Sequence, residues 1–115
     1  MKRVLIVDDH GPFRAIAREL LEGAGYLVSG EAADAAEALA AVAADLPDAV
    51  LLDVQLPDRD GFSLAATLTR NGGPAVVLIS SREAEDYGRR ITACGARGFI
   101  PKSKLSAETF AALVQ

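Results

Sequence analysis

Five short apolar runs alternate with five helix-like stretches, and this alternation limits the possible folds more than any other feature of the sequence. The runs cover residues 4–7, 27–28 with a weak continuation at 30–32, 49–52, 75–79 and 98–100. The third and fourth runs have no polar alternation, which is typical of strands buried on both faces of a parallel sheet. The pattern therefore predicts a parallel sheet that is covered by helices.

The stretches between the runs have apolar residues at helical spacing. Helices are predicted over residues 13–24, 34–43, 62–68 and 83–94, with a fifth that begins near residue 106. In the fourth helix, Tyr87 and Ile91 are expected to face inward. Parallel strands need right-handed crossovers, and five strands are too few for a closed barrel. We therefore expect a single α/β domain over residues 1–115, with no second domain: a doubly wound, flavodoxin-like, five-stranded parallel sheet in the order 2-1-3-4-5, with helices on both faces.

The composition argues against several classes of function. The formal net charge is -4 and the sequence pI is about 4.9, which disfavours direct nucleic-acid binding and a polybasic membrane contact. Hydrophobic residues make up 50%, enough for one core. Cys94 is the only cysteine, so an internal disulfide is excluded. The apolar run after residue 3 is too short for a signal peptide, and no run approaches a membrane span, so we expect a soluble, cytoplasmic protein.

Three aspartates follow two of the apolar runs. Asp8 and Asp9 come directly after the first run, and Asp53 comes after the third. The first and third strands are neighbours in the predicted order, so the three carboxylates would converge at the carboxyl edge of the sheet. Two like charges about 4 Å apart repel by about 4 kcal/mol at an effective dielectric of about 20, and Mg²⁺ would remove that penalty. The alternative is that each aspartate only caps a helix or a turn.

Lys102, Ser80 and Phe99 lie at or near the same predicted edge. Lys102 follows the fifth run, and Ser80 ends the fourth. The lysine could pair with a phosphoryl oxygen and the serine hydroxyl could donate to one, although Lys102 could also be solvated and Ser80 has capping-box spacing to Glu83. Phe99 lies in the fifth strand, where its ring is either core or moves between outward and inward positions.

In their order and spacing, these residues resemble the receiver domain of two-component response regulators. The resemblance covers essentially the whole chain, and the segments that carry it, besides Asp53 and Ser80, are Val-Asp-Asp-His at 7–10, Leu-Pro-Asp-Arg-Asp-Gly at 56–61 and Gly-Ala-Arg-Gly-Phe-Ile-Pro-Lys at 95–102. The first of these segments and Gly-Phe-Ile-Pro-Lys are most similar to receivers of the LuxR, NarL and FixJ type, which are joined to helix-turn-helix domains.

The resemblance implies a role for each residue of the acidic cluster. Asp53 would be the phosphoacceptor. Asp8 and Asp9 would hold Mg²⁺, or Mn²⁺ as a substitute, together with the Asp53 carboxylate and the backbone carbonyl of Gln55. Lys102 would contact the phosphoryl group.

The remaining implied roles concern switching and the lifetime of the phosphoryl group. Ser80 would be the switch hydroxyl, and Phe99 stands where receivers carry the switch aromatic. Serine replaces the commoner threonine, and phenylalanine replaces the frequent tyrosine, so that switching at residue 99 would rest on packing alone. Gln55 and Arg82 occupy places that tune the phosphoryl lifetime in the family.

The function that the resemblance implies is phosphorelay signal transduction. A phosphohistidine on a sensor histidine kinase would donate its phosphoryl group to Asp53, so the domain would be a signalling module and not a turnover enzyme. The fourth helix, fifth strand and fifth helix would form the output face. The implied partners are the kinase, a second copy of the chain on the output face, and an effector protein or DNA-binding domain outside these residues.

Two alternatives share part of this pattern. A phosphatase of the haloacid-dehalogenase kind would also use an aspartate and Mg²⁺, but it needs a second acid two residues after the nucleophile, and neither Asp8 nor Asp9 has one. A phosphorylation-silent pseudo-receiver would lack an acid or the lysine, and none is missing here. No Walker or dinucleotide fingerprint follows the first run.

Overall fold

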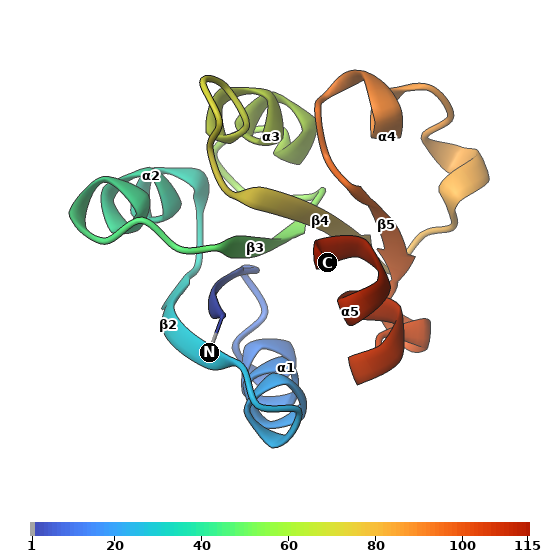
Figure 1. The fold of residues 1–115 in the computed structure, drawn as a ribbon. Coiled ribbons are helices and arrows are strands. Elements are labelled where there is room, and N and C mark those ends of the chain that lie inside the picture. Colours follow the sequence, from blue (N-terminus) through green and yellow to red (C-terminus); the bar gives the residue numbers. More distant parts are fainter. Residues whose placement is uncertain (1) are drawn as a thin grey trace.

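The computed structural model describes residues 2–115 and confirms the predicted five-stranded parallel sheet (Figure 1). The strand order is β2-β1-β3-β4-β5, as predicted. The strands are β1 (Arg3–Val7), β2 (Leu27–Ala32), β3 (Ala49–Asp53), β4 (Ala75–Ser80) and β5 (Gly98–Pro101). The α-helices are α1 (Gly11–Gly23), α2 (Ala35–Ala44), α3 (Gly61–Leu68), α4 (Arg90–Ala93) and α5 (Ala107–Val114). Two short 3₁₀ turns are η1 (Ala84–Asp86) and η2 (Lys102–Lys104).

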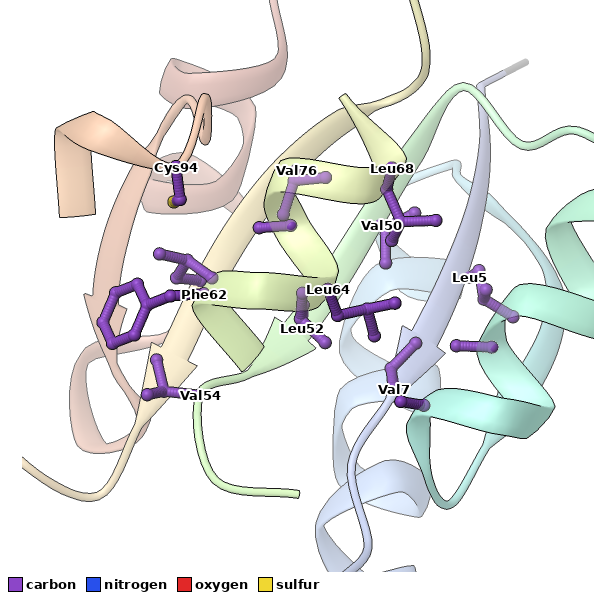
Figure 2. Packing of buried hydrophobic residues seen from close by; sticks show 14 of the residues in the cluster. Leu5, Val7, Val50, Leu52, Val54, Phe62, Leu64, Leu68, Val76 and Cys94 are labelled. Carbon is purple, nitrogen blue, oxygen red and sulfur yellow. The ribbon is translucent and has the colours of Figure 1, made fainter. Parts of the chain in front are cut away.

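Helices cover both faces of the sheet, with α2, α3 and α4 on one side and α1 and α5 on the other (Figure 1). Successive strand residues point to opposite faces, so each central strand contributes to two separate apolar layers. Figure 2 shows the layer beneath α3, where Phe62, Leu64 and Leu68 pack against Val50 and Leu52 of β3. This double burial explains why the third and fourth runs of the sequence show no polar alternation.

The weak second run is a complete but irregular strand. The pairing of β1 with β2 shifts register, because Val4 pairs with Val28 and Leu5 with Gly30. Ser29 is thus skipped as a bulge, which interrupts the apolar pattern of this edge strand.

The predicted fourth helix over residues 83–94 is wrong. The chain forms η1, then turns at Gly88, and only four residues form α4. Gly88 has a φ of 57°, a left-handed conformation that ends a right-handed helical turn. The apolar spacing that predicted one helix is therefore split by a glycine in its interior.

Two contacts fix the loop between β3 and α3. The Asp58 carboxylate accepts hydrogen bonds from the first backbone N–H groups of α2, at Ala35 and Ala36. A Cβ atom on Gly61 would lie 2.6 Å from the backbone oxygen of Asp53, so only glycine allows α3 to begin this close to the end of β3. Within residues 2–115, no helix is both long and apolar enough to cross a bilayer.

Candidate functional site

The strand order brings the three predicted aspartates together. Asp8 directly follows β1, and β1 pairs in register with β3, which ends at Asp53. Ligand oxygens of Asp8, Asp9 and Asp53 all lie within 4.8 Å of one another. Asp8 is fully buried and Asp53 is 5% exposed, whereas Asp9 is exposed to solvent. Two carboxylates are thus withdrawn from water, while the third keeps the cluster open to solvent.

Lys102 reaches the same cluster from the start of η2, directly after β5. Its Nζ lies 2.7 Å from Oδ2 of Asp8 and 3.2 Å from Oδ2 of Asp53. The ammonium is also 4.5 Å from the centre of the Phe13 ring, within cation–π range. Three carboxylates face one ammonium in this cluster, so its net charge stays negative.

Burial raises the pKa of the Asp53 carboxyl, and the Asp8 carboxylate raises it further. The Gln55 backbone N–H, which donates to Asp53 Oδ1 at 3.0 Å, and the Lys102 ammonium act in the opposite direction, but the net shift of the Asp53 pKa is upward. For Lys102, burial lowers the pKa, but the two carboxylates outweigh burial and raise it overall. Lys102 therefore stays charged, and additional positive charge would stabilise the ionised form of Asp53.

The donor set fits a small, hard divalent cation. Oδ2 of Asp8 is buried and has no hydrogen-bonding partner of good geometry within residues 2–115. Mg²⁺ prefers one or two carboxylates and keeps several waters, and Mn²⁺ accepts the same oxygen ligands. Asp8, Asp9 and Asp53 match this preference, while the backbone carbonyl of Gln55 as a fourth ligand stays a prediction.

Ser80, at the end of β4, has a partner that sequence reasoning missed. Its side chain is fully buried, and its Oγ lies 2.7 Å from the Tyr87 hydroxyl and accepts a hydrogen bond from the Arg82 backbone N–H at 3.1 Å. The capping box predicted as an alternative for Ser80 does not form, because the Glu83 backbone N–H is bonded to Asp86. Tyr87 was expected only to face inward, and no sequence signal separates that position from a contact with Ser80.

Phe99 does not touch the acidic cluster. Its ring is half-buried and meets the Tyr87 ring edge-on at 5.6 Å, and Tyr87 in turn meets Phe62 at 5.3 Å. The link from Phe99 to Ser80 therefore passes through Tyr87. Arg82 and Gln55 are both exposed at the rim of the site, and each contributes a backbone N–H to it.

Known proteins match this chain along nearly its whole length. The family model described as "response regulator receiver domain" matches residues 4–114. A probable transcriptional regulatory protein NarL of Mycobacterium tuberculosis is 36% identical over 114 residues, which cover 97% of this chain and 53% of that protein. The virulence regulator BvgA of Bordetella pertussis, named a putative positive transcription regulator, is 35% identical over 101 residues, which cover 87% of this chain and 48% of that protein.

Solved structures agree with these relatives. The receiver domain of the NarL response regulator of Mycobacterium tuberculosis superposes with a TM-score of 0.87 at 36% identity, covering 98% of this chain and 93% of that one. The chemotaxis response regulator CheY4 of Vibrio cholerae gives a TM-score of 0.83 at 28% identity, covering 97% of this chain and 94% of that one.

The chain belongs to the response regulator receiver domain family, as its motifs predicted. The predicted similarity to regulators of the NarL type is confirmed as well, and BvgA is a further relative. Receiver domains are signalling modules of two-component systems, and they generally bind Mg²⁺ in an acidic pocket. The chain spans about half the length of the curated relatives it matches.

Proposed function

We propose that this domain accepts a phosphoryl group on Asp53 from the phosphohistidine of a sensor histidine kinase and passes the signal to an effector. The observation that carries the proposal is the junction of Asp8, Asp9, Asp53 and Lys102 at one edge of the sheet, with Asp53 nearly buried between opposing charges. A purely structural cluster would have no need for three carboxylates around one ammonium.

In the proposed reaction, an oxygen of the Asp53 carboxylate attacks phosphorus in line, and the bond from phosphorus to the donor nitrogen breaks. The electron pair of that bond stays on the imidazole of the kinase. A carboxylate is a weak nucleophile, so its positioning contributes most of the catalysis. Before phosphoryl transfer, the Gln55 N–H and Lys102 each hold one oxygen of Asp53, which restricts the orientation of the carboxylate.

Asp8, Asp9 and Asp53 would hold the divalent cation, with the backbone carbonyl of Gln55 as a further ligand. Mg²⁺, or Mn²⁺ in its place, would neutralise charge on the phosphoryl oxygens. Lys102 would move from the carboxylates toward one of those oxygens as a point charge. The buried Oδ2 of Asp8, whose 2.7 Å contact with Lys102 lacks good hydrogen-bond geometry, supports this assignment.

Ser80 would donate its hydroxyl to the phosphoryl group, and Phe99 would respond through packing. The new group carries about -1.5 to -2 charges, which favours a conformer that brings Ser80 and Lys102 to it. Gln55 and Arg82 would tune how long the phosphoryl group survives. The output face would consist of α4, β5 and α5.

The proposed partners follow from the family. They are the sensor kinase, a second copy of the chain on the output face, and an effector protein or a DNA-binding domain outside these residues. Several relatives are named transcriptional regulators and are about twice as long as this chain, which supports a DNA-binding effector. We place the domain in the cytoplasm, where it would meet the kinase, with no direct contact to nucleic acid or membrane.

Labelling with acetyl phosphate and binding of beryllofluoride, both with Mg²⁺, test the proposal. The wild type should be modified by the first and bind the second, and Asp53→Asn should lose both responses. Asp48→Asn is the matched control, because it makes the same charge change just before the other end of β3, where Asp48 accepts a hydrogen bond from the Arg3 backbone.

A folded wild type that gives no response to either reagent would contradict the proposal and favour a pseudo-receiver. Multiple turnover of a generic phosphate ester would instead favour a phosphatase.

A further inference from the structure

The hydroxyl of Ser80 has a limited set of partners. Its Oγ lies near the Arg82 backbone N–H and the Tyr87 hydroxyl, and these are its hydrogen-bond partners within residues 2–115. The amide can only donate, so the acceptor for the serine hydrogen is the oxygen of Tyr87. Ser80 is fully buried, and a buried hydroxyl hydrogen without an acceptor is unfavourable. Either hydroxyl could donate across this 2.7 Å contact, and donation from Ser80 to Tyr87 is the direction that leaves no buried serine hydrogen unpaired.

We propose that Tyr87 is a resting-state latch, which holds the one hydrogen that Ser80 could donate to a phosphoryl group on Asp53. The inference rests on the proposed function, because it takes Asp53 as the phosphoacceptor. Phosphoryl oxygens only accept hydrogen bonds, so they compete with Tyr87 for this hydrogen. A hydrogen bond to a charged acceptor is stronger than one to a neutral hydroxyl. Ser80 therefore donates to the phosphoryl group, and its hydrogen bond to Tyr87 breaks.

The latch connects the acceptor site to the surface segment that follows β4. Tyr87 directly follows η1, and neither η1 nor α4 contains a buried residue. Its ring lies between Phe62 and Phe99, with edge-on contacts to both. Releasing the hydroxyl therefore removes a polar restraint on a ring that contacts Phe99 of β5. Phe99 lacks a hydroxyl, so Tyr87 supplies the polar part of this connection.

The variant Tyr87→Phe tests the latch, since it keeps the ring and removes only the hydroxyl. Without the competing acceptor, beryllofluoride should bind in the presence of Mg²⁺ about three- to ten-fold more tightly, the equivalent of one neutral hydrogen bond. Tyr26→Phe is the matched control. Tyr26 packs edge-on against Phe110 in the other apolar layer, so its loss of a hydroxyl should leave the affinity unchanged.

A double-mutant cycle separates the latch from a general effect on folding. In a Ser80→Ala background there is no hydrogen to compete for, so adding Tyr87→Phe should leave the affinity unchanged. Weaker or unchanged binding by Tyr87→Phe alone, or equal tightening in both backgrounds, would overturn the latch. If the wild type itself does not bind beryllofluoride, the proposed function fails first, which is a different result.

Tyrosine fluorescence gives a second readout that does not need the Tyr87→Phe protein to fold. The chain has two tyrosines and no tryptophan, so Tyr87 is the only tyrosine in Tyr26→Phe. Beryllofluoride with Mg²⁺ should change the emission of this variant as the bond to Ser80 breaks. Unchanged emission at saturating beryllofluoride would count against the latch.

Discussion

Helix α1 and the 81–93 segment have the same length but differ in how much of each is buried. The 81–93 segment follows β4 and includes η1 and α4. Helix α1 is a continuous helix of 13 residues and buries Ala17 and Leu21 fully. The 81–93 segment forms a three-residue turn and a four-residue helix, and neither contains a buried residue. Segments with little buried apolar area open most easily. The comparison indicates that the face beside β5 can move while α1 holds its side of the site fixed.

The largest expected difference comes from removing one aliphatic side chain in each region. Leu21→Ala, in α1, should lower the free energy of unfolding by about 2–5 kcal/mol, because Leu21 is fully buried. Ile91→Ala, in α4, should lower it by about 1 kcal/mol or less, because Ile91 is only half-buried. Urea denaturation of both variants gives the two values. Equal losses would show that the 81–93 segment is anchored as firmly as α1.

Replacing one glycine by alanine in each region should change the free energy of unfolding by a smaller amount. The two changes should have opposite signs. Gly88→Ala should destabilise the protein by about 1–2 kcal/mol, because alanine is strained at a φ of 57°. Gly23→Ala should stabilise it by about 0.4–1 kcal/mol, because a Cβ there meets no atom within 4 Å and alanine restricts the unfolded chain. Thermal unfolding should move the two melting temperatures in opposite directions. A stabilising Gly88→Ala would mean that a regular helix can form over this segment.

The smallest expected effect is a pH-dependent contribution to stability from Glu31, which pairs with two arginines of α1. The pKa of the Glu31 carboxyl in β2 lies below its ordinary value of 4.5, chiefly through its hydrogen bond with Arg18, and Arg14 adds to the shift. Because the folded-state pKa is the lower one, this contribution is complete above pH 4.5 and is lost as pH falls through the folded-state value. These groups are partly exposed, so we expect about 0.2–1 kcal/mol.

Denaturation of Glu31→Gln and wild type at pH 7 and in acid measures this contribution. The variant should be less stable at pH 7, and the difference should shrink in acid. A difference that stays constant with pH would show that the carboxylate charge contributes nothing.

The strand order and the acidic cluster could be predicted because both follow from simple rules. Buried parallel strands give continuous apolar runs, and crossover handedness leaves few arrangements, so Asp8 and Asp53 had to meet if β1 and β3 were neighbours. Lys102 and Ser80 follow by the same reasoning, since each stands at the end of a strand. Their chemical roles remain predictions.

The 81–93 segment could not be predicted in the same way. Its apolar spacing favoured one helix, but Gly88 inside it takes a left-handed conformation that the spacing does not reveal. The bond from Tyr87 to Ser80 depends on how an irregular segment folds back, for which no periodic pattern exists. The bulge at Ser29 could not be predicted either, because an irregular strand register leaves only a weak apolar run in the sequence.

The position of Lys102 after β5 has a consequence for synthesis on the ribosome. Asp8, Asp9 and Asp53 emerge early, but the ammonium that offsets their charge is translated only after all five strands of the sheet. A nascent chain that stops at β4 has the three acids but not Lys102, whose ammonium contacts Asp8 and Asp53. The proposed phosphoacceptor site is therefore complete only after translation has passed residue 102, when Lys102 can join Asp8 and Asp53.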